Sequence, residues 1–523
     1  MLNEPCVEVR TERGRVLGRM EPVGGARGGC RAAVAVFRGI PFAKPPLGAL
    51  RFAAPEPPAA WDGSRPATRF GPPVPQYDRM NPPAAGQEAE GGPEPDCLSV
   101  NVWSPGLGAT GLPVMVWFHG GAYAFGHSGD PAYDGALLAS EGVVVVTFNY
   151  RVGMEGFGQI EGAPANRGLL DQLAALRWVR DNIAAFGGDP DRVTAFGESA
   201  GAGSIAALLA SDAADGLFGR AITQSVPGSY FTPDLAADIA DAVARLVGRA
   251  PTAEALRTVE PSALVRAAEE VHAERGRRAG RWGVVAHAET LFSPVVDGRL
   301  PARTPWDALA AGAARGVGLM AGCNHDEYRL FMAKRREFGR VSAERAAWAM
   351  TVFGAEAGGE RACIAAFPGL GDEELYERVC SDWLCRVPTL RLLEAAAEAG
   401  GRAFGYELRW PAPVLGGLLG ACHGLDVPLV LGTLDAPASV ALLGPGPSEE
   451  AEALSRRMRT AWVRFAATGD PGWPAYDTDG RLTKVFDRRD SVEPDPLGAS
   501  RVLWGKAGFG VLGLADHRSE RRR

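Results

Sequence analysis

The sequence predicts an α/β protein built on a large, mostly parallel, twisted sheet flanked by helices. Short apolar runs typical of buried strands, such as 113–118 and 142–148, alternate with longer segments that carry apolar residues at helical spacing. This alternation is typical of βαβ units. In addition, the strand-like run 193–196 leads into Gly197-Glu-Ser-Ala-Gly201 and then into a helix of small residues. A strand, a Gly-x-Ser-x-Gly turn and a helix in this order are typical of a nucleophile elbow.

The first hundred residues are predicted to combine a hairpin, a strand and irregular structure. Residues 7–20 alternate as a hairpin does, and 32–37 reads as a further strand. The proline-rich stretch 37–52 is expected to follow an extended path, because proline removes a helix donor and restricts the residue before it. Proline, alanine, glycine and glutamate dominate residues 65–96, which predicts an irregular loop.

The rest of the chain is predicted to alternate core strands with helical segments. The expected strands are 97–103, 113–118, 142–148, 193–196, 219–225, 316–322 and 404–410, the last being the final core strand. Amphipathic helices are expected at 166–186 and 449–467. We expect residues 1–523 to form a single domain, in which helical insertions at about 233–315 and 341–399 cap the site and the tail 517–523 is frayed.

Composition narrows the possible partners and compartment. The formal net charge of −7 argues against nucleic acid and anionic membranes as partners. No apolar run reaches the roughly 18 residues of a membrane span, and the N-terminus lacks the pattern of a signal peptide. Eight cysteines are too sparse for a disulfide scaffold. Cys380 and Cys385 have no histidine near them in the sequence, so we expect them to be free thiols and not metal ligands. We expect no metal and no cofactor. The compositional features together predict a cytoplasmic protein.

Ser199 is the predicted nucleophile of the elbow. The strand-to-helix turn is so sharp that the central residue is strained, and the residues two places away must lack bulk. Gly197 and Gly201 meet that need. The N–H of Ala200 lies at the positive end of the following helix, where it can bind a developing oxyanion. The alternative is an ordinary glycine-rich turn in a chain with 68 glycines.

A second set of oxyanion donors is expected after the strand 113–118. It continues into His119-Gly-Gly-Ala-Tyr-Ala-Phe-Gly126, where adjacent glycines let backbone amides turn toward a ligand. We expect the N–H groups of Gly121 and Ala122 to join that of Ala200. His119 is expected to shape this loop and not to transfer protons.

His423 is the predicted partner of Ser199. In this architecture the chain order is serine, acid, histidine. Only His423 and His517 follow both Ser199 and a plausible acid near a strand end, and His517 lies in the polar tail. A buried structural histidine is the alternative. Three acids can orient its ring. Glu327 ranks first and Asp326 second, since both follow the strand 316–322, and Asp426 ranks third because it would have to fold back within its own loop.

With these residues placed, the chain resembles the type-B carboxylesterase/cholinesterase family, which has the α/β-hydrolase fold. The matching motifs are Phe37-Arg-Gly-Ile-Pro-Phe-Ala-x-Pro-Pro, Asp96-Cys-Leu-Ser-Val-Asn, His119-Gly-Gly-Ala, Asn149-Tyr-Arg-Val-Gly, Asn166-x-Gly-Leu-x-Asp-Gln172, Gly197-Glu-Ser-Ala-Gly201, Asn324-x-Asp-Glu327 and His423-Gly. The resemblance implies that Glu327 is the acid of the triad and that Gly121, Ala122 and Ala200 form the oxyanion hole.

The resemblance also implies ester hydrolysis, and two departures from the family pattern narrow the expected substrates and cross-links. Eukaryotic members pair the cysteine matching Cys97 with one upstream, but no cysteine lies between Cys30 and Cys97. The loop 65–96 also lacks the choline-binding tryptophan of cholinesterases. We therefore expect a hydrolase of small-molecule carboxylic esters that resembles bacterial carboxylesterases and is a monomer or small homo-oligomer. A carbamate or amide hydrolase and a non-catalytic adhesion member are the alternatives, and the role of Glu198 is open.

Overall fold

In the computed structural model, the described residues are 6–24, 30–77, 97–354, 359–505 and 509–515. Their strands form one 13-stranded sheet with the order β1-β2-β3-β5-β7-β6-β8-β9-β10-β11-β12-β13, and β4 pairs with β2. The strands are β1 (Cys6–Arg10), β2 (Arg15–Gly24), β3 (Cys30–Pro41), β4 (Ser64–Pro66), β5 (Ser99–Ser104), β6 (Leu112–Phe118), β7 (Val144–Phe148), β8 (Gly188–Glu198), β9 (Arg220–Gln224), β10 (Gly318–Asn324), β11 (Ala403–Leu408), β12 (Leu482–Phe486) and β13 (Ser491–Pro494).

The centre of the sheet is parallel, as the alternating pattern predicts. All neighbouring pairs from β7 through β6, β8, β9, β10 and β11 to β12 run parallel. The hairpin expected at 7–20 is the antiparallel pair β1–β2. Because parallel strands end at the same edge of a sheet, the segments that follow β6, β8, β9 and β10 meet along one edge.

Two apolar clusters cover the two faces of the sheet. On β6, Val114, Val116 and Phe118 belong to one cluster, whereas Met115 and Trp117 belong to the other. The first cluster includes residues of α3 (Arg167–Asn182), α4 (Ala200–Leu209) and α14 (Val387–Glu398). The second includes residues of α15 (Asp426–Leu431) and α17 (Glu449–Thr468). The sheet therefore lies between two helical layers, and this burial on both faces explains why its central strands are almost continuously apolar.

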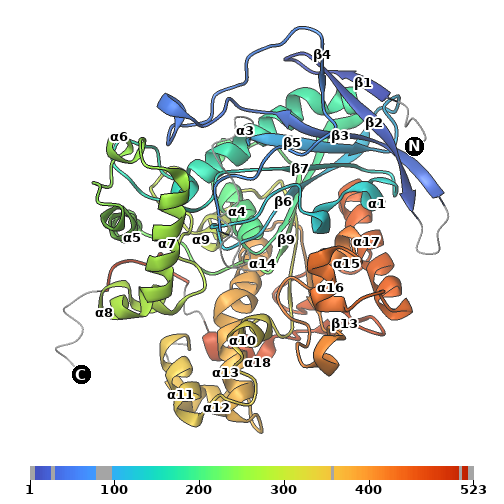
Figure 1. The fold of residues 1–523 in the computed structure, drawn as a ribbon. Coiled ribbons are helices and arrows are strands. Elements are labelled where there is room, and N and C mark those ends of the chain that lie inside the picture. Colours follow the sequence, from blue (N-terminus) through green and yellow to red (C-terminus); the bar gives the residue numbers. More distant parts are fainter. Residues whose placement is uncertain (1–5, 25–29, 78–96, 355–358, 506–508, 516–523) are drawn as a thin grey trace.

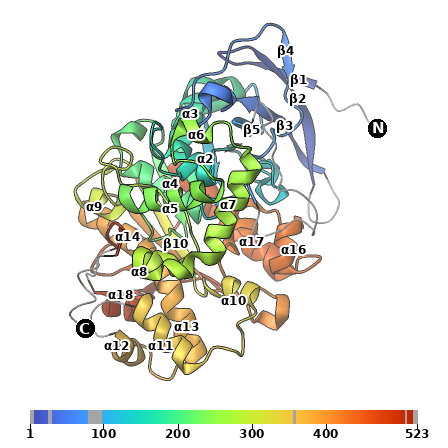
Figure 2. The same cartoon turned by 60° about the vertical axis from the view of Figure 1, so that its left-hand side comes forward.

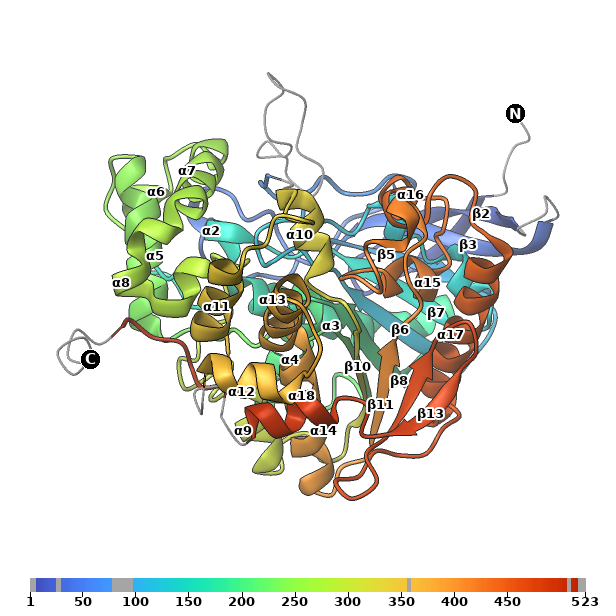
Figure 3. The same cartoon turned by 90° about the horizontal axis from the view of Figure 1, so that it is seen from below.

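The helical insertions predicted at 233–315 and 341–399 are present. The first contains α5 (Pro233–Leu246), α6 (Ala253–Leu256), α7 (Pro261–Glu274), α8 (Ala279–Trp282) and α9 (Pro305–Ala310); the second contains α11 (Ala343–Val352), α12 (Gly359–Ala366), α13 (Asp372–Ser381) and α14. Figures 1 and 3 show α5–α8 in green and α15–α17 in orange on opposite sides of the molecule. In Figure 2, α11–α13 gather at one end, where they share a third apolar cluster that also includes Tyr328, Met332, Leu384 and Cys385.

Short helices complete the connections between these layers. They are α1 (Ala136–Ala139), α2 (Gly153–Phe157), α10 (Arg329–Arg335), α16 (Pro437–Leu443) and α18 (Gly498–Trp504). No described helix has both the length and the apolar character that crossing a bilayer requires.

One prediction about the sheet is wrong. The sequence indicated 404–410 as the final core strand, but β12 pairs in parallel with β11 and β13 pairs antiparallel with β12. These strands are only five and four residues long and carry polar residues such as Lys484. Their stability comes from the neighbouring strand more than from their own pattern. Most of the loop predicted at 65–96 and the whole tail 517–523 lie outside the described residues.

Candidate active site

Ser199 occupies the sharp turn between β8 and α4. Its backbone has φ 54° and ψ −122°, a strained conformation for a residue with a side chain. A Cβ atom at Gly201 would lie 2.0 Å from the carbonyl oxygen of Phe118, and one at Gly197 would lie 2.6 Å from that same oxygen. The neighbouring strand β6 therefore leaves room for glycine alone at both positions, which is the physical basis of the Gly-x-Ser-x-Gly pattern.

A chain of short contacts joins the three residues that the sequence ranked first. Nε2 of His423 lies 2.9 Å from Oγ of Ser199, and Nδ1 of His423 lies 2.6 Å from Oε2 of Glu327. Glu327 follows β10, and His423 lies in the connection between β11 and α15. The common edge of the parallel strands thus brings together residues that are 96 and 224 positions apart.

Glu327 is completely buried and is held by two further donors. The hydroxyl of Ser225 donates to Oε1 at 2.6 Å, and the backbone N–H of Asn324 donates to the same oxygen at 2.8 Å. Oε2 therefore faces His423. Sequence reasoning missed the part played by Ser225, although its position at the end of the predicted strand 219–225 placed it at the same edge of the sheet.

The two competing acids make other contacts. Asp326 accepts from the backbone N–H of Ala421 at 2.9 Å and forms an ion pair with Arg329. Asp426 begins α15, where it accepts from Gln224 at 2.8 Å and from Tyr406 at 3.2 Å. Both carboxylates are engaged in holding the loops around the site.

The loop after β6 has the unusual backbone that the paired glycines suggested. Gly121 has φ 112° and Ala122 has φ 53°. A Cβ at Gly121 would lie 2.0 Å from the carbonyl oxygen of Phe125, so no larger residue fits there without movement of the loop. Within the described part of the chain, no acceptor is paired with the N–H groups of Gly121, Ala122 or Ala200. These three donors are thus available to a ligand.

His119 is buried at the start of this loop and contacts its backbone. It is 1% exposed, its ring stacks on Tyr150 with 4.2 Å between centroids, and its Nδ1 lies 2.9 Å from the carbonyl oxygen of Gly120. Burial lowers the pKa of His119 to about 3, so the ring stays neutral. This environment agrees with a structural role for His119.

Glu198 contacts the same nitrogen of His423 as Ser199 does. Its Oε1 lies 3.1 Å from Nε2 of His423. Burial raises the pKa of Glu198 to about 8. Burial lowers the pKa of His423, but the charges of Glu198 and Glu327 outweigh burial and raise that pKa to about 9. The titrations of Glu198 and His423 are therefore coupled, and each group binds its proton more tightly than it would in water.

A cavity of about 720 Å³ opens over Ser199. Its walls include residues from the loop after β6, from α10, from α16 and from the connection that carries His423. Large apolar side chains contribute much of the lining, among them Phe331, Leu384, Leu419 and Leu442. His272 from the first insertion and Leu384 from the second also line it.

Comparison with known proteins identifies the family. Residues 4–486 match the model of the carboxylesterase family. The chain belongs to this family. The resemblance seen in the motifs and the expected α/β-hydrolase fold are thereby confirmed, and the protein is a carboxylic ester hydrolase.

Individual carboxylesterases match over almost their whole length. The para-nitrobenzyl esterase of Bacillus subtilis (strain 168) is 36% identical over 511 residues, covering 94% of this chain and 97% of that one. The fumonisin B1 esterase of Sphingopyxis macrogoltabida is 35% identical over 486 residues, with 88% and 84% covered. The crystal structure of the Geobacillus stearothermophilus carboxylesterase EST55 superposes with a TM-score of 0.79 at 36% identity, covering 95% of this chain and 99% of that one.

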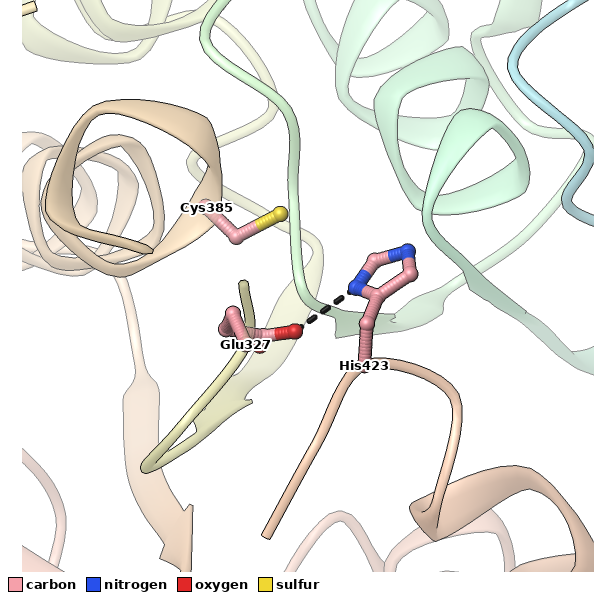
Figure 4. Close-up of side chains that lie close together, drawn as sticks. All are labelled: Glu327, Cys385 and His423. Carbon is pink, nitrogen blue, oxygen red and sulfur yellow. Dashed lines mark hydrogen bonds and ion pairs between the residues drawn. The ribbon is translucent and has the colours of Figure 1, made fainter. Parts of the chain in front are cut away.

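The cysteines of this carboxylesterase bear on the disulfide and metal expectations. The seven cysteines whose side chains the structure describes are free thiols, Cys97 among them. In the described part of the chain, a single cluster has the composition and spacing of metal ligands: one atom each of Glu327, Cys385 and His423, all within 4.8 Å of one another. Figure 4 shows Cys385 reaching toward the Glu327–His423 pair. The sequence placed no histidine near Cys385, and the fold supplies one.

Proposed function

We propose that this carboxylesterase cleaves its substrates through an acyl-enzyme on Ser199, with His423 as general base and acid and Glu327 as the orienting acid. The observation that carries this proposal is the pair of contacts on His423, 2.9 Å to Ser199 on one ring nitrogen and 2.6 Å to Glu327 on the other. A serine, an imidazole and a carboxylate in this order are the parts of a serine hydrolase triad.

The reaction begins with proton transfer from Oγ of Ser199 to Nε2 of His423 as the serine attacks the ester carbonyl. Glu327 holds the proton on Nδ1, which leaves the lone pair of Nε2 directed at the serine. The imidazolium then donates its new proton to the leaving alcohol. In the second half, water gives a proton to His423 as it attacks the acyl-enzyme, and His423 returns that proton to Oγ of Ser199 as the carboxylic acid leaves.

The tetrahedral oxyanion is stabilised by the backbone N–H groups of Gly121, Ala122 and Ala200. Their lack of a partner within the described protein supports this assignment. Ala200 is also the first residue of α4, whose positive end favours an anion. A donor of this kind typically contributes about 3 kcal/mol to the barrier reduction.

The substrates we propose are small-molecule esters with small to medium acyl groups. The cavity of about 720 Å³ and its apolar lining support neutral, apolar groups on at least one side of the ester. A panel of p-nitrophenyl and p-nitrobenzyl esters with graded acyl chains measures the preference. Carbamate and amide analogues belong in the same panel, because the same triad can attack those carbonyls.

Labelling by a fluorophosphonate tests the nucleophile. We expect the label on the peptide that contains Ser199, together with turnover of p-nitrophenyl esters by the unmodified protein. Ser199→Ala should lose both while its circular dichroism spectrum and melting temperature stay close to those of the parent. Label on another serine, or near-normal turnover by Ser199→Ala, would show that the assignment is wrong.

Domain organisation, assembly state and cellular location are proposed as follows. We propose that residues 1–523 form a single domain, which the continuous sheet from β1 to β13 supports. We also propose a cytoplasmic monomer or small homo-oligomer. Light scattering coupled to gel filtration measures the assembly state, and cell fractionation measures the location.

A further inference from the structure

We propose that Cys385, Glu327 and His423 bind a thiophilic divalent cation such as Cd²⁺ or Zn²⁺, and that this cation inhibits the esterase by occupying the histidine. The basis is the cluster in Figure 4, in which one sulfur, one nitrogen and one carboxylate oxygen lie within 4.8 Å of one another. Binding depends only on this geometry, whereas inhibition rests on the proposed role of His423.

A π-helical turn places Cys385 at the site. Residues Asp382–Arg386 form this turn between α13 and α14, and π-helical turns are frequent at functional sites. Arg386 donates to the backbone carbonyl of His325 at 2.5 Å, which ties the turn to the loop that carries Glu327. This bond therefore fixes the position of Cys385 relative to the carboxylate of Glu327. Both Cys385 and His423 line the cavity.

The ligand set suits a soft or borderline cation. Cysteine sulfur, histidine nitrogen and carboxylate oxygen are the ligands that Zn²⁺ takes, at distances of roughly 2.0–2.3 Å. Such distances require small inward shifts of the three side chains. A three-residue set leaves a fourth position open, and the cavity can supply water to fill it. Hard cations such as Mg²⁺ prefer oxygen ligands, so they should not compete.

The proton balance explains inhibition. The thiol proton of Cys385 leaves when the sulfur binds as a thiolate. When Nδ1 of His423 binds the cation, it releases its proton to solvent, and the ring stays neutral by taking up a proton on Nε2. That nitrogen faces Ser199 as a donor and cannot accept the serine proton. Bound cation, thiolate, carboxylate and neutral imidazole together carry no net charge.

The thiol of Cys385 must lose its proton to bind a cation, and burial makes this loss unfavourable. Burial raises the pKa of Cys385 well above its ordinary value, and the charges of Glu327 and Glu198 raise it further. The thiol is therefore protonated and unreactive before a cation arrives. Only a strongly thiophilic ion is expected to displace that proton.

Cadmium titration of the full-length protein tests binding without relying on activity. Because Cys6 is exposed, every variant carries Cys6→Ser to remove a competing thiol. Ser199→Ala in this background should bind Cd²⁺ with the ultraviolet charge-transfer band of a cadmium–thiolate bond. Adding Cys385→Ser or Cys385→Ala should abolish the band, whereas adding Cys97→Ser, which removes a buried thiol outside the cavity, should preserve it.

Inhibition is measured with the active protein in chelator-treated buffer, and each variant is normalised to its own metal-free rate. We expect Cd²⁺ to inhibit reversibly, Mg²⁺ to have no effect, and loss of the Cys385 thiol to raise the half-inhibitory Cd²⁺ concentration by at least about tenfold. Unchanged inhibition of both Cys385 variants, or absence of the thiolate band in the parent, would overturn the proposal. If the protein binds Cd²⁺ but Ser199 takes no fluorophosphonate label, the result contradicts the proposed function and leaves the metal site standing.

Discussion

Oε1 of Glu198 lies 3.1 Å from Nε2 of His423, the same nitrogen that lies 2.9 Å from Oγ of Ser199. The histidine therefore has a carboxylate on each side of its ring, Glu198 at Nε2 and Glu327 at Nδ1. An imidazolium between two carboxylates is stabilised, which favours the charged intermediate of ester cleavage. The same arrangement holds a proton on the free enzyme at neutral pH and so limits the fraction that can act as a base.

Glu198→Gln should move the acid limb of the kcat/KM profile to lower pH. The folded-state pKa of His423 is raised to about 9, in part by the charge of Glu198, so removal of that charge lowers the pKa and frees the base at lower pH. The plateau rate should fall, because the imidazolium of the transition state loses a carboxylate. Rates measured from pH 5 to pH 10 check both effects. Glu289→Gln removes another carboxylate of the cavity and should leave the limb in place.

Glu327→Gln should lower kcat far more than Asp326→Asn. An amide at position 327 cannot hold the proton of Nδ1 as a carboxylate does, and replacing the orienting acid of a triad by its amide costs about 10⁴-fold in kcat. Asp326 contacts Ala421 and Arg329, so its neutral variant should affect mainly the stability of the loop. Steady-state kinetics with both variants checks the ranking, and the reverse order would assign the acid to Asp326.

Gly121→Ala should lower kcat by about 10²- to 10³-fold, the usual cost of losing one oxyanion donor. The added methyl group would lie 2.0 Å from the carbonyl oxygen of Phe125, so the loop must shift and its N–H groups move with it. Ala122→Gly is the matched control: it removes a methyl group from the adjacent residue, where glycine tolerates φ 53°. Equal losses of kcat in the two variants would mean that the clash with Phe125 is not the cause of the loss.

Most of the parallel sheet could be predicted because its strands are buried on both faces. Continuous apolar runs such as 113–118 and 142–148 indicate that environment directly, and the structure has β6 and β7 there. The strands β12 and β13 escaped prediction because they are short and half-polar, and pairing with the existing sheet stabilises them. Their sequences contain too few apolar residues to reveal them.

A local sequence pattern is enough to predict Ser199 as the nucleophile, because the strained turn needs glycine at 197 and 201. The sequence also narrowed the partners to His423 and a few acids through chain order. The contacts between side chains depend on the packing of the whole fold. Ser225 contacts Glu327, Glu198 contacts His423, and Cys385 lies beside Glu327 and His423. These contacts join segments far apart in the chain at the common edge of the parallel strands. Their distances depend on how the strands pack together, which no local pattern records.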